Sequence, residues 1–278
     1  MKSVTSRTMR LMQKRATEET HPAWLREYRE EQIANLKAKV GFCFRPIVLE
    51  DRYREGRPEA EGSCILVRLN GMRYLISAAH VLHEIKSRRT FVWTKHGMVE
   101  LGGGVLLSTV SLETKVFPME NVDFAILALD DTLYPESEDS DFLPEGEIDF
   151  DGKTKADRVY VGIGFPVCLA KRGDSPTSIN LQYITYAGPG RPDVLKRKKL
   201  SPQQHVTFEF DRINSLITGG TRQTAPKPTG MSGGPIFRLD HTGNGNHKLI
   251  GIMTDWLEHN QAILGAHIGL CREALNQQ

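Results

Sequence analysis

The chain has 278 residues, of which 39% are hydrophobic and 25% charged, and its formal net charge is +2. This length allows one large domain or two modest ones with ample core, and so small a net charge creates no overall field that would attract nucleic acid. No apolar run of roughly 18 residues occurs, so no membrane-spanning helix is predicted. Residues 1–29 are polar and have no apolar core segment, so no secretory signal is predicted either.

The cysteine pattern favours a reducing compartment. Four cysteines, Cys43, Cys64, Cys168 and Cys271, are widely spaced and form no C-x-x-C pair. Reduced thiols in a cytoplasmic protein are therefore expected, with a Cys43–Cys64 bridge as the alternative. No H-E-x-x-H spacing and no phosphate-binding glycine pattern occurs, so the sequence predicts neither a metal nor a cofactor.

The first half of the chain alternates between short apolar runs and turn residues. Residues 1–20 are expected to be mobile, and a helix is predicted from Pro22 to about Lys39, because Pro suits a first helical turn and a loose apolar stripe follows. Asn70-Gly71 between two apolar runs predicts a β-hairpin with arms at 63–69 and 72–77. The charged residues 51–62 are expected to form a loop. Further strands are predicted at 42–49, 90–94, 98–107, 110–117 and 124–129.

The second half follows an acidic segment. Residues 130–151 hold ten acidic residues and no Lys or Arg, which predicts a surface connection between two halves. The basic segment 191–199 is expected to be a solvated loop, with binding of an acidic partner or nucleic acid as the alternative. Strands are predicted at 158–165, 179–187, 205–212, 234–239, 248–256 and 262–269, and a short helix at 271–278.

One stretch at 228–237, Pro-Thr-Gly-Met-Ser-Gly-Gly-Pro-Ile-Phe, places Ser232 among three glycines. Glycine reaches backbone angles that other residues avoid, and it leaves the backbone N–H groups bare. An acyl-transfer site needs an exposed hydroxyl beside two N–H groups that can hold an oxyanion. A Gly- and Pro-rich turn that carries an ordinary serine is the alternative.

Two further residues form a pattern with Ser232. His80 ends the run Leu-Ile-Ser-Ala-Ala-His, and Asp123 opens the run Val-Asp-Phe-Ala-Ile-Leu. Alone, such a histidine is usually structural and such an aspartate is usually a cap or turn residue. The order His, Asp, Ser in these contexts resembles the chymotrypsin/trypsin-like serine peptidase family, over about residues 41–270. The segments Val-Gly-Ile-Gly-Phe-Pro at 161–166 and Leu-Ile-Gly-Ile at 249–252 resemble further strands of that family.

Many short strands with turn signals indicate barrels or sandwiches. The resemblance narrows this to an all-β fold of two six-stranded antiparallel β-barrels (trypsin-like), with an N-terminal helical extension and a short C-terminal helix. The expected division is a helical extension at 1–40, a first barrel with His80 and Asp123 at 41–130, an acidic inter-barrel linker at 131–157, and a second barrel with Ser232 at 158–278.

The resemblance also implies a catalytic triad and peptide hydrolysis through an acyl-enzyme on Ser232. His80 would be the general base, Asp123 would orient its imidazole, and Ser232 would be the nucleophile. The backbone N–H groups of Gly230 and Ser232 would form the oxyanion hole. Thr254 stands where the family places a hydroxyl that supports the aspartate, with a plain strand threonine as the alternative.

The chain departs from the secreted members of the family. Met231 replaces the aspartate that pairs with a new N-terminus after zymogen cleavage, and Val81 replaces the cysteine that follows the histidine. The chain is therefore more similar to stand-alone bacterial trypsin-like peptidases of the Htr type, although no PDZ-like segment follows the second barrel. We expect no cleavage-dependent switch through Met231, and control by loop order, a partner or residues 1–40.

The specificity pocket is expected from the loop before Ser232 and the strands after it. Its candidates are Pro226, Lys227, Thr254, Asp255, Trp256 and His267. The run Gly-Ala-His-Ile-Gly at 265–269 resembles pocket strands in which a histidine reads Glu or Gln, which favours an acidic or Gln preference through His267. A buried structural histidine is the alternative, and Asp255 would instead favour Lys or Arg.

The predicted function is therefore a cytoplasmic serine endopeptidase that acts on protein or peptide substrates. A regulatory protein partner could bind residues 1–40, as in a protease of a stress or defence system, whereas contact with a membrane or with nucleic acid is not expected. The competing hypothesis is a catalytically silent peptide-binding module on the same fold, because a fold alone does not determine a function.

Overall fold

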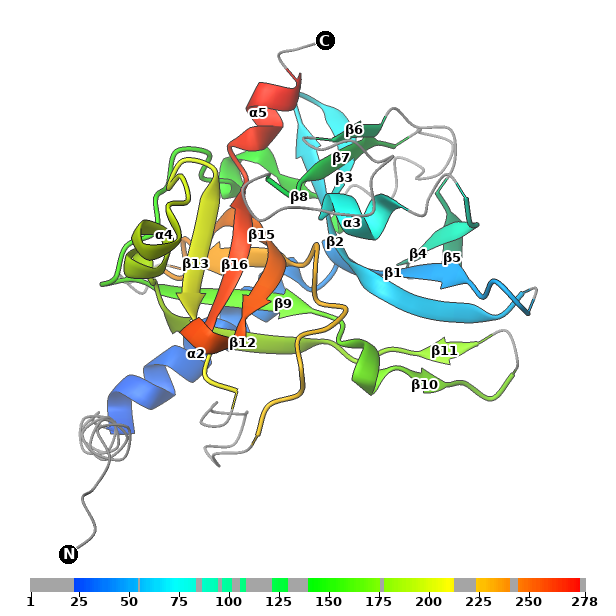
Figure 1. Ribbon diagram of the computed structural model, residues 1–278, viewed down its shortest axis with the longest axis horizontal. Helices are drawn as coiled ribbons and strands as arrows, with labels where there is room; N and C mark the ends of the chain where they lie inside the picture. Colours follow the sequence, from blue (N-terminus) through cyan, green and yellow to red (C-terminus); the bar gives the residue numbers. More distant parts are fainter. Residues whose placement is uncertain are drawn as a thin grey trace, which may run out of the picture.

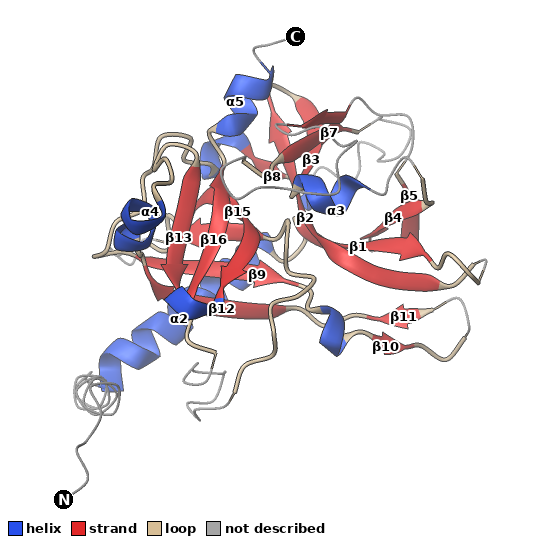
Figure 2. Ribbon diagram, in the orientation of Figure 1, coloured by secondary structure: helices blue, strands red, loops and turns tan. Residues whose placement is uncertain are grey.

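The structure is a computed structural model that describes residues 23–54, 56–83, 87–94, 97–101, 106–108, 122–129, 140–175, 178–212, 224–240 and 245–275. Two β-sheets make up most of these residues, with short helices at their edges (Figures 1 and 2). The predicted all-β fold with two β-units is therefore confirmed. The mobile segment predicted at 1–20 and the strand predicted at 110–117 lie outside the described residues.

Among the described residues the first sheet has eight strands, two more than expected, in the order β5-β4-β1-β2-β3-β7-β6, with β8 paired to β2. All pairs are antiparallel except that of β8 with β2. The predicted hairpin is present, since Asn70 and Gly71 connect β2 to β3 with positive φ angles of 49° and 79°. The strands are β1 (Phe44–Glu50), β2 (Pro58–Leu69), β3 (Met72–Ser77), β4 (Thr90–Thr94), β5 (Gly97–Glu100), β6 (Leu106–Ser108), β7 (Ala125–Ala128) and β8 (Leu143–Pro144).

Strand β2 begins earlier than predicted. Residues 51–62 were expected to form a loop because they are charged, but Pro58 already pairs with Glu50 of β1 and Ala60 pairs with Val48. A β-bulge between Ile47 and Val48 accommodates the extra residue of β2. Pairing with β1 therefore overrides the polar composition of this segment, and only residues 51–57 remain as the connection.

Within the described residues the second sheet has the predicted six strands, and their order is β12-β9-β14-β15-β16-β13. An antiparallel bridge between Gly190 and Phe208 joins the end of β12 to β13, so the sheet closes on itself into a barrel. The predicted strand at 179–187 is divided, because its first part pairs in a separate hairpin of β10 with β11. The strands are β9 (Val159–Gly164), β10 (Lys171–Arg172), β11 (Ile179–Asn180), β12 (Ile184–Pro189), β13 (His205–Glu209), β14 (Pro235–Arg238), β15 (Lys248–Leu257) and β16 (Ala262–His267).

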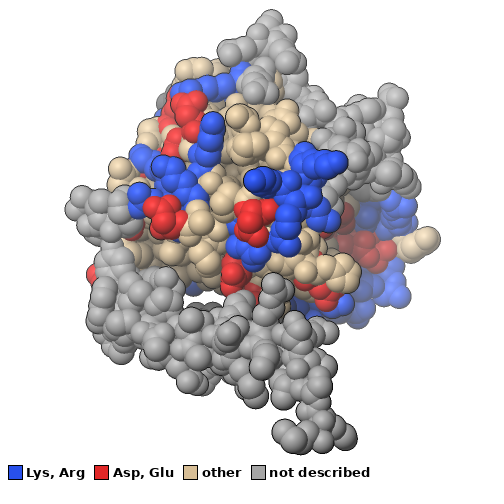
Figure 3. All heavy atoms as spheres, turned by 60° about the vertical axis from the view of Figure 1, so that its left-hand side comes forward, with Lys and Arg blue, Asp and Glu red and all other residues tan. Residues whose placement is uncertain are grey.

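The basic segment forms the helix α4 (Pro192–Lys198) rather than a loop. Val194 and Leu195 are buried against Leu257 and Leu264. This packing stabilises a helix, although the basic composition of the segment led to the prediction of a loop. In Figure 3, which turns the α4 side of the molecule forward, Lys and Arg side chains lie among acidic ones rather than in one unbroken basic field. Asp193, for example, is paired with Arg191 at 2.8 Å and with Arg197 at 3.0 Å.

The terminal helices are confirmed. Helix α2 (Ala23–Val40) runs along the lower left of Figure 1, and its Leu36 and Val40 are buried in the main core. Lys39 of α2 also forms an ion pair with Glu147 at 2.7 Å. The C-terminal helix α5 (Leu270–Leu275) buries Leu270 in the same core. The remaining helices are α3 (Ala79–Leu82), η3 (Glu145–Glu147), η4 (Val167–Leu169) and η5 (Glu258–Asn260).

The described part of the acidic segment, 140–151, is only partly a surface connection. Phe142, Leu143, Ile148 and Phe150 are buried in the hydrophobic core, and Asp141 is 1% exposed. Leu143 pairs with β2 of the first sheet, whereas Ile148 forms a bridge with β15 of the second sheet. The segment therefore packs against both sheets, because its apolar residues alternate with the acidic ones.

The cysteines are free. Cys43 and Cys64 belong to separate hydrophobic clusters, so the alternative of a bridge between them is not realised. Burial raises the pKa of each of these two thiols to about 12. Among the described helices, none is long and apolar enough to cross a membrane, and no group of metal-ligating side chains is found in the same part of the chain.

Candidate active site

The structure joins His80 and Asp123 directly. His80 lies in α3, immediately after β3, and Asp123 lies just before β7. Strands β3 and β7 pair with Ser77 opposite Ala125, so both side chains emerge at the same end of the paired strands. Nδ1 of His80 is 2.5 Å from Oδ2 of Asp123, and the backbone N–H of His80 donates to Oδ1 at 3.0 Å. Both carboxylate oxygens therefore hold the same residue in place.

The charges around His80 favour its protonated form. Burial lowers the pKa of the imidazole, but the hydrogen bond and charge of Asp123, together with the charges of Glu61 and Asp255, outweigh burial and raise the pKa above its ordinary value. Glu61 belongs to the first sheet and Asp255 to the second. Carboxylates of both sheets therefore favour the protonated imidazole.

Ser232 lies in a turn that only glycine can complete. Gly230 and Gly233 have φ angles of +88° and +84°, in the left-handed region. A Cβ on Gly233 would lie 2.0 Å from the carbonyl oxygen of Ser63 and 2.1 Å from Oγ of Ser77, so this glycine also permits close packing. The turn therefore packs closely against the first sheet. It is also held to the second sheet, because the N–H of Gly233 donates to the carbonyl of Met253 in β15 at 2.7 Å.

Two backbone N–H groups of this turn are uncommitted. Those of Met231, Gly233 and Gly234 donate to carbonyl groups at 2.7–2.9 Å. Within the described part of the chain, the N–H groups of Gly230 and Ser232 donate to no protein acceptor. These are the two groups predicted to form an oxyanion hole. They would donate hydrogen bonds to the substrate oxygen on which negative charge develops.

The serine turn and α3 meet at Gly62 and Ser63, inside β2. A Cβ on Gly62 would lie 2.5 Å from the side chain of Val81, which follows His80, and 3.2 Å from the carbonyl oxygen of Ser232. That same carbonyl accepts the N–H of Ser63 at 2.8 Å. The hydroxyl of Ser232 is half-buried and donates to the carbonyl of Thr254 at 3.3 Å. The three predicted residues therefore belong to one region of the structure, with the serine hydroxyl turned toward β15.

Ser63 and Ser77 connect the parts of the site, and the sequence did not identify them. The hydroxyl of Ser63 donates to Gly230 O and accepts the N–H of Phe165, each at 3.0 Å. The hydroxyl of Ser77 donates to Ser63 O at 2.7 Å, and both serines are buried. Ser77 is part of the run that ends at His80, but nothing local to it shows that its partner is 14 residues away.

Apart from His267, the candidate pocket residues lie either on strand β15 or in the segment before Ser232. Thr254 donates through Oγ1 to Leu264 O at 3.4 Å, and Asp255 is exposed beside it. Trp256 packs against Phe210, with ring centroids 6.1 Å apart. Tyr186 Oη donates to the carbonyl of Pro226, and Cys168 Sγ lies 4.0 Å from that of Lys227. Strand β15 thus brings Thr254, Asp255 and Trp256 next to the Ser232 turn, and the hydrogen bond of Thr254 fits the plain strand threonine.

His267 occupies a different position from the one predicted. Its ring is buried, with Nε2 2.5 Å from Gly152 O and Nδ1 accepting the N–H of Gly269 at 2.9 Å. Both ring nitrogens are thus held by backbone of the chain's own structure. This arrangement fits the structural alternative for His267 and gives no support to a preference for Glu or Gln through this residue.

Comparisons with known proteins returned only structural similarity. No family model matches the chain, and no curated protein matches it. Catalytically active tobacco etch virus protease in complex with product is 10% identical, with 86% of this chain and 80% of that chain covered and a TM-score of 0.44. Tobacco vein mottling virus protease is 10% identical, with coverages of 82% and 78% and a TM-score of 0.43. The HtrA-type protease AlgW with a tripeptide is 14% identical, with coverages of 88% and 62% and a TM-score of 0.47.

Proposed function

We propose that the chain is a trypsin-like serine endopeptidase with Ser232 as nucleophile, His80 as general base and Asp123 as its orienting partner. The observation that carries the proposal is the 2.5 Å contact between Nδ1 of His80 and Oδ2 of Asp123. Because Asp123 occupies Nδ1, the other ring nitrogen is the one that can accept the proton of the serine. The proposed reaction requires the hydroxyl of Ser232 to turn from the carbonyl of Thr254 toward that nitrogen.

The reaction begins when Oγ of Ser232 attacks the carbonyl carbon of a peptide and its proton passes to Nε2 of His80. The carbonyl electrons move to oxygen, and the N–H groups of Gly230 and Ser232 stabilise the resulting oxyanion. When the C–N bond breaks, the imidazolium gives its proton to the departing amine. Water then enters, loses a proton to His80 and releases the acid from Ser232 by the same steps in reverse order.

A fluorophosphonate probe tests the proposal, because it reacts only with an activated serine. We expect the intact chain to be labelled, Ser232→Ala to be unlabelled, and Asp123→Asn to lose about four orders of magnitude in peptide hydrolysis, since the imidazole is then held in the wrong tautomer. Circular dichroism of each variant checks that it remains folded. Equal labelling of the intact chain and Ser232→Ala would contradict the proposal.

The competing function, a catalytically silent peptide-binding module, is favoured by one observation: the hydroxyl of Ser232 points to Thr254 O at 3.3 Å. That distance is long for an O–H···O bond, for which about 2.7–2.8 Å is usual, and catalytic contacts are often loose before substrate binds. An intact chain that binds peptides but resists the probe would support the binding module.

The proposed setting is a regulated protease inside the cell. Free cysteines support a reducing compartment, since none of the four is paired. A regulatory partner would bind residues 1–40, but Leu36 and Val40 of helix α2 are buried in the main core, so removal of the whole segment would also disturb the fold. A pull-down with the full chain and with a chain that lacks residues 1–22 tests this partner, because the shorter chain should lose it.

A further inference from the structure

The two uncommitted N–H groups of the serine turn belong to peptide groups whose carbonyls are held. In a trans peptide group the C=O and the N–H point in opposite directions, and the peptide groups of this turn are trans. The partner of each carbonyl therefore fixes the direction of the N–H of the next residue. The carbonyls of Thr229 and Met231 thus control where the N–H groups of Gly230 and Ser232 point.

Both of these carbonyls accept a backbone hydrogen bond. The carbonyl of Thr229 accepts the N–H of Val167, and the carbonyl of Met231 accepts the N–H of Gly234, each at 2.9 Å. The N–H of Gly230 is therefore directed away from Val167, and the N–H of Ser232 is directed away from Gly234. Rotation of either peptide group would break one of these bonds, so the two donors are oriented before a substrate binds.

The two bonds differ in origin. Gly234 belongs to the turn itself, so the support of the Ser232 N–H is local. Val167 lies far earlier in the chain, at the start of η4 and just after β9. Its contact with the turn is close, because a Cβ on Gly230 would lie 2.6 Å from the side chain of Val167 and 2.9 Å from the carbonyl oxygen of Phe165. The direction of the Gly230 N–H therefore depends on how residues 165–167 are held against the turn.

Ser63 holds these two segments together. Its hydroxyl accepts the N–H of Phe165 and donates to the carbonyl of Gly230, each at 3.0 Å. One side chain of β2 in the first sheet is thus bonded both to the segment that carries Val167 and to the turn that carries the donor. Because Ser63 is 1% exposed, loss of its hydroxyl would leave a buried N–H and a buried carbonyl without this partner, which is costly.

The backbone of Ser63 is fixed as well. Its carbonyl accepts the hydroxyl of Ser77 at 2.7 Å, and its N–H donates to the carbonyl of Ser232 at 2.8 Å. The N–H, the carbonyl and the hydroxyl of this residue are therefore all engaged between β3, residues 165–167 and the serine turn. The side chain is preorganised and needs no rearrangement to support the site.

We propose that Ser63 is a positioning residue for the oxyanion hole. Its hydroxyl keeps residues 165–167 against the turn, so that the N–H of Gly230 points to the substrate oxygen on which negative charge develops. Ser63 acts through Val167 and Gly230 rather than on the substrate. This inference rests on the proposed peptidase function, because it assigns a further residue to the same site.

The variant Ser63→Ala tests the proposal, with the library peptide that the unaltered chain cleaves fastest as substrate. We expect kcat to fall by about 10- to 100-fold and KM to change by less than about two-fold, because the affected donor acts mainly in the transition state. Outright removal of an oxyanion-hole donor costs about 10²- to 10³-fold in kcat. The expected loss is smaller because the N–H of Gly230 is still present in Ser63→Ala.

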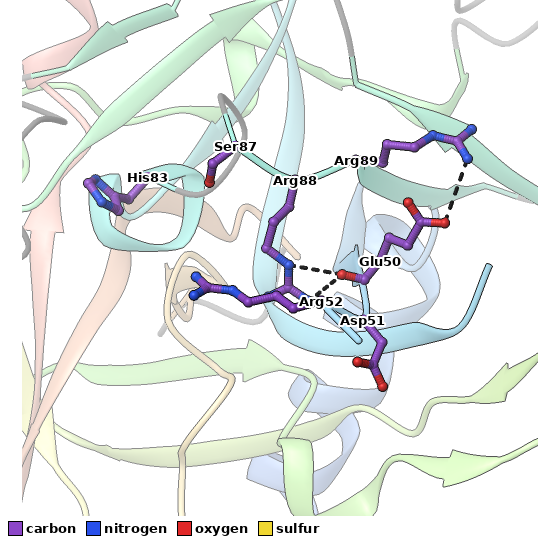
Figure 4. Close-up of a pocket in the computed structure, with 7 residues that line it drawn as sticks. All are labelled: Glu50, Asp51, Arg52, His83, Ser87, Arg88 and Arg89. Atoms are coloured by element: carbon purple, nitrogen blue, oxygen red, sulfur yellow. Dashed lines mark hydrogen bonds and ion pairs between the residues drawn. The ribbon is translucent and has the colours of Figure 1, made fainter. Parts of the chain in front are cut away.

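The matched control is Thr90→Val, which also removes a buried hydroxyl that donates to a backbone carbonyl. Thr90 is likewise 1% exposed, and its Oγ1 donates to the carbonyl of Arg88 at 3.1 Å. Arg88 lines the polar pocket drawn in Figure 4, and β1 separates β4, which carries Thr90, from β2 in the sheet. Both variants should lower the midpoint of urea unfolding, but Thr90→Val should keep the kcat of the unaltered chain.

The split between kcat and KM decides the proposal. A fall in kcat that is no larger in Ser63→Ala than in Thr90→Val, or an effect on KM alone, overturns it even when the fluorophosphonate probe labels Ser232. If Ser63→Ala does not fold, Ser63→Cys is measured by the same criteria, because a thiol occupies the same position but is only a weak donor.

A structural readout separates this inference from the proposed function. If the probe does not label the unaltered chain, the proposed function fails, and a crystal structure of the folded Ser63 variant then decides the inference. A carbonyl of Thr229 that still accepts the N–H of Val167 overturns the inference, whereas a rotated peptide group between Thr229 and Gly230 supports it.

Discussion

At the scale of single residues, the candidate site is controlled by the charges around one imidazole. Asp123 contacts His80 directly, and Glu61 and Asp255 act on it from the two sheets. Together they raise the pKa of His80 despite its burial. A base must be neutral to accept a proton, so these carboxylates set the lowest pH at which the proposed reaction runs.

The pH dependence of activity should report this pKa. We expect kcat/KM to fall as the pH drops through a pKa above the ordinary histidine value of 6.5. Asp255→Asn removes one negative charge, so the acidic limb of the profile should move to lower pH. The shift should shrink in high salt, since the Debye length falls from about 10 Å at 0.1 M to about 3 Å at 1 M.

The matched control for this prediction is Glu258→Gln, an exposed acid in η5 that does not act on the pKa of His80. Its profile should coincide with that of the unaltered chain. If the acidic limb of the Asp255→Asn profile lies at the same pH as that of the unaltered chain, the charge of Asp255 does not affect the pKa of His80.

The same raised pKa has the opposite consequence for stability. A group whose pKa is higher in the folded chain stabilises it fully below the unfolded pKa, and that contribution disappears as the pH rises through the folded pKa. The His80 contribution to the free energy of unfolding is therefore lost over the range in which activity appears. The proposed site is most active where this interaction stabilises the fold least.

At the scale of elements, the serine turn depends on Gly233 for two separate reasons: its positive φ angle and the contact with Ser63 and Ser77. Gly245 provides a comparison, because its φ angle is +69° but nothing lies near the position of an added Cβ. The two glycines thus separate the effect of backbone strain from that of packing.

Gly233→Ala should lower the free energy of unfolding by clearly more than Gly245→Ala does. Left-handed backbone at a residue other than glycine costs roughly 1–2 kcal/mol, and only the Gly233 variant must also move β2 and the serine turn apart. Urea unfolding measures the difference, and loss of probe labelling in Gly233→Ala alone should accompany it. Equal losses of stability in the two variants would mean that the contact contributes nothing.

Helix α2 is an integral part of the fold rather than a removable extension. Its Leu36 is fully buried in the same core as Phe124 and Leu270. Leu36→Ala should therefore destabilise the chain by about 2–5 kcal/mol, measured by urea unfolding. Asn35→Ala, an exposed position of the same helix, should change it by less than about 0.5 kcal/mol. An equally small effect of both substitutions would show that α2 does not support the body.

At the scale of the whole molecule, the two sheets share one core. A single hydrophobic cluster contains Phe44 and Ile65 of the first sheet together with Val161 and Ile252 of the second. The proposed site lies along this junction, where the N–H of Ser63 in the first sheet donates to the carbonyl of Ser232 in the turn of the second. Movement of one sheet against the other would therefore separate Ser232 from His80, so rigid packing here supports the geometry of the site.

A buried ion pair contributes to this arrangement. Arg45 of β1 lies 3.3 Å from Asp141, and the two side chains are 9% and 1% exposed. Asp141→Asn leaves the charge of Arg45 buried without its counterion, which costs about 3–5 kcal/mol. The control is Asp151→Asn, because the side chain of Asp151 is 92% exposed and 3.7 Å from Arg272. If the two substitutions destabilise the chain equally in urea unfolding, Asp141 is not the counterion that Arg45 requires.

The amino-acid sequence by itself determined the local features of this protein. The Asn70-Gly71 turn, the glycines around Ser232 and the strands that flank His80 and Asp123 follow from neighbouring residues, because turn angles and strand alternation are set within a few positions of the chain. The grouping of the three distant motifs into one site came instead from the resemblance of their order and contexts to a known peptidase family, and it stays a prediction.

Only the tertiary structure decided the features that depend on distant partners. Residues 192–198 form a helix because Val194 and Leu195 pack against Leu257 and Leu264. The ring of His267 is buried against the carbonyl of Gly152, which lies 115 residues away in the chain. Burial and hydrogen bonding between such segments arise from folding and leave no local period in the sequence, so no inspection of neighbouring residues reveals them.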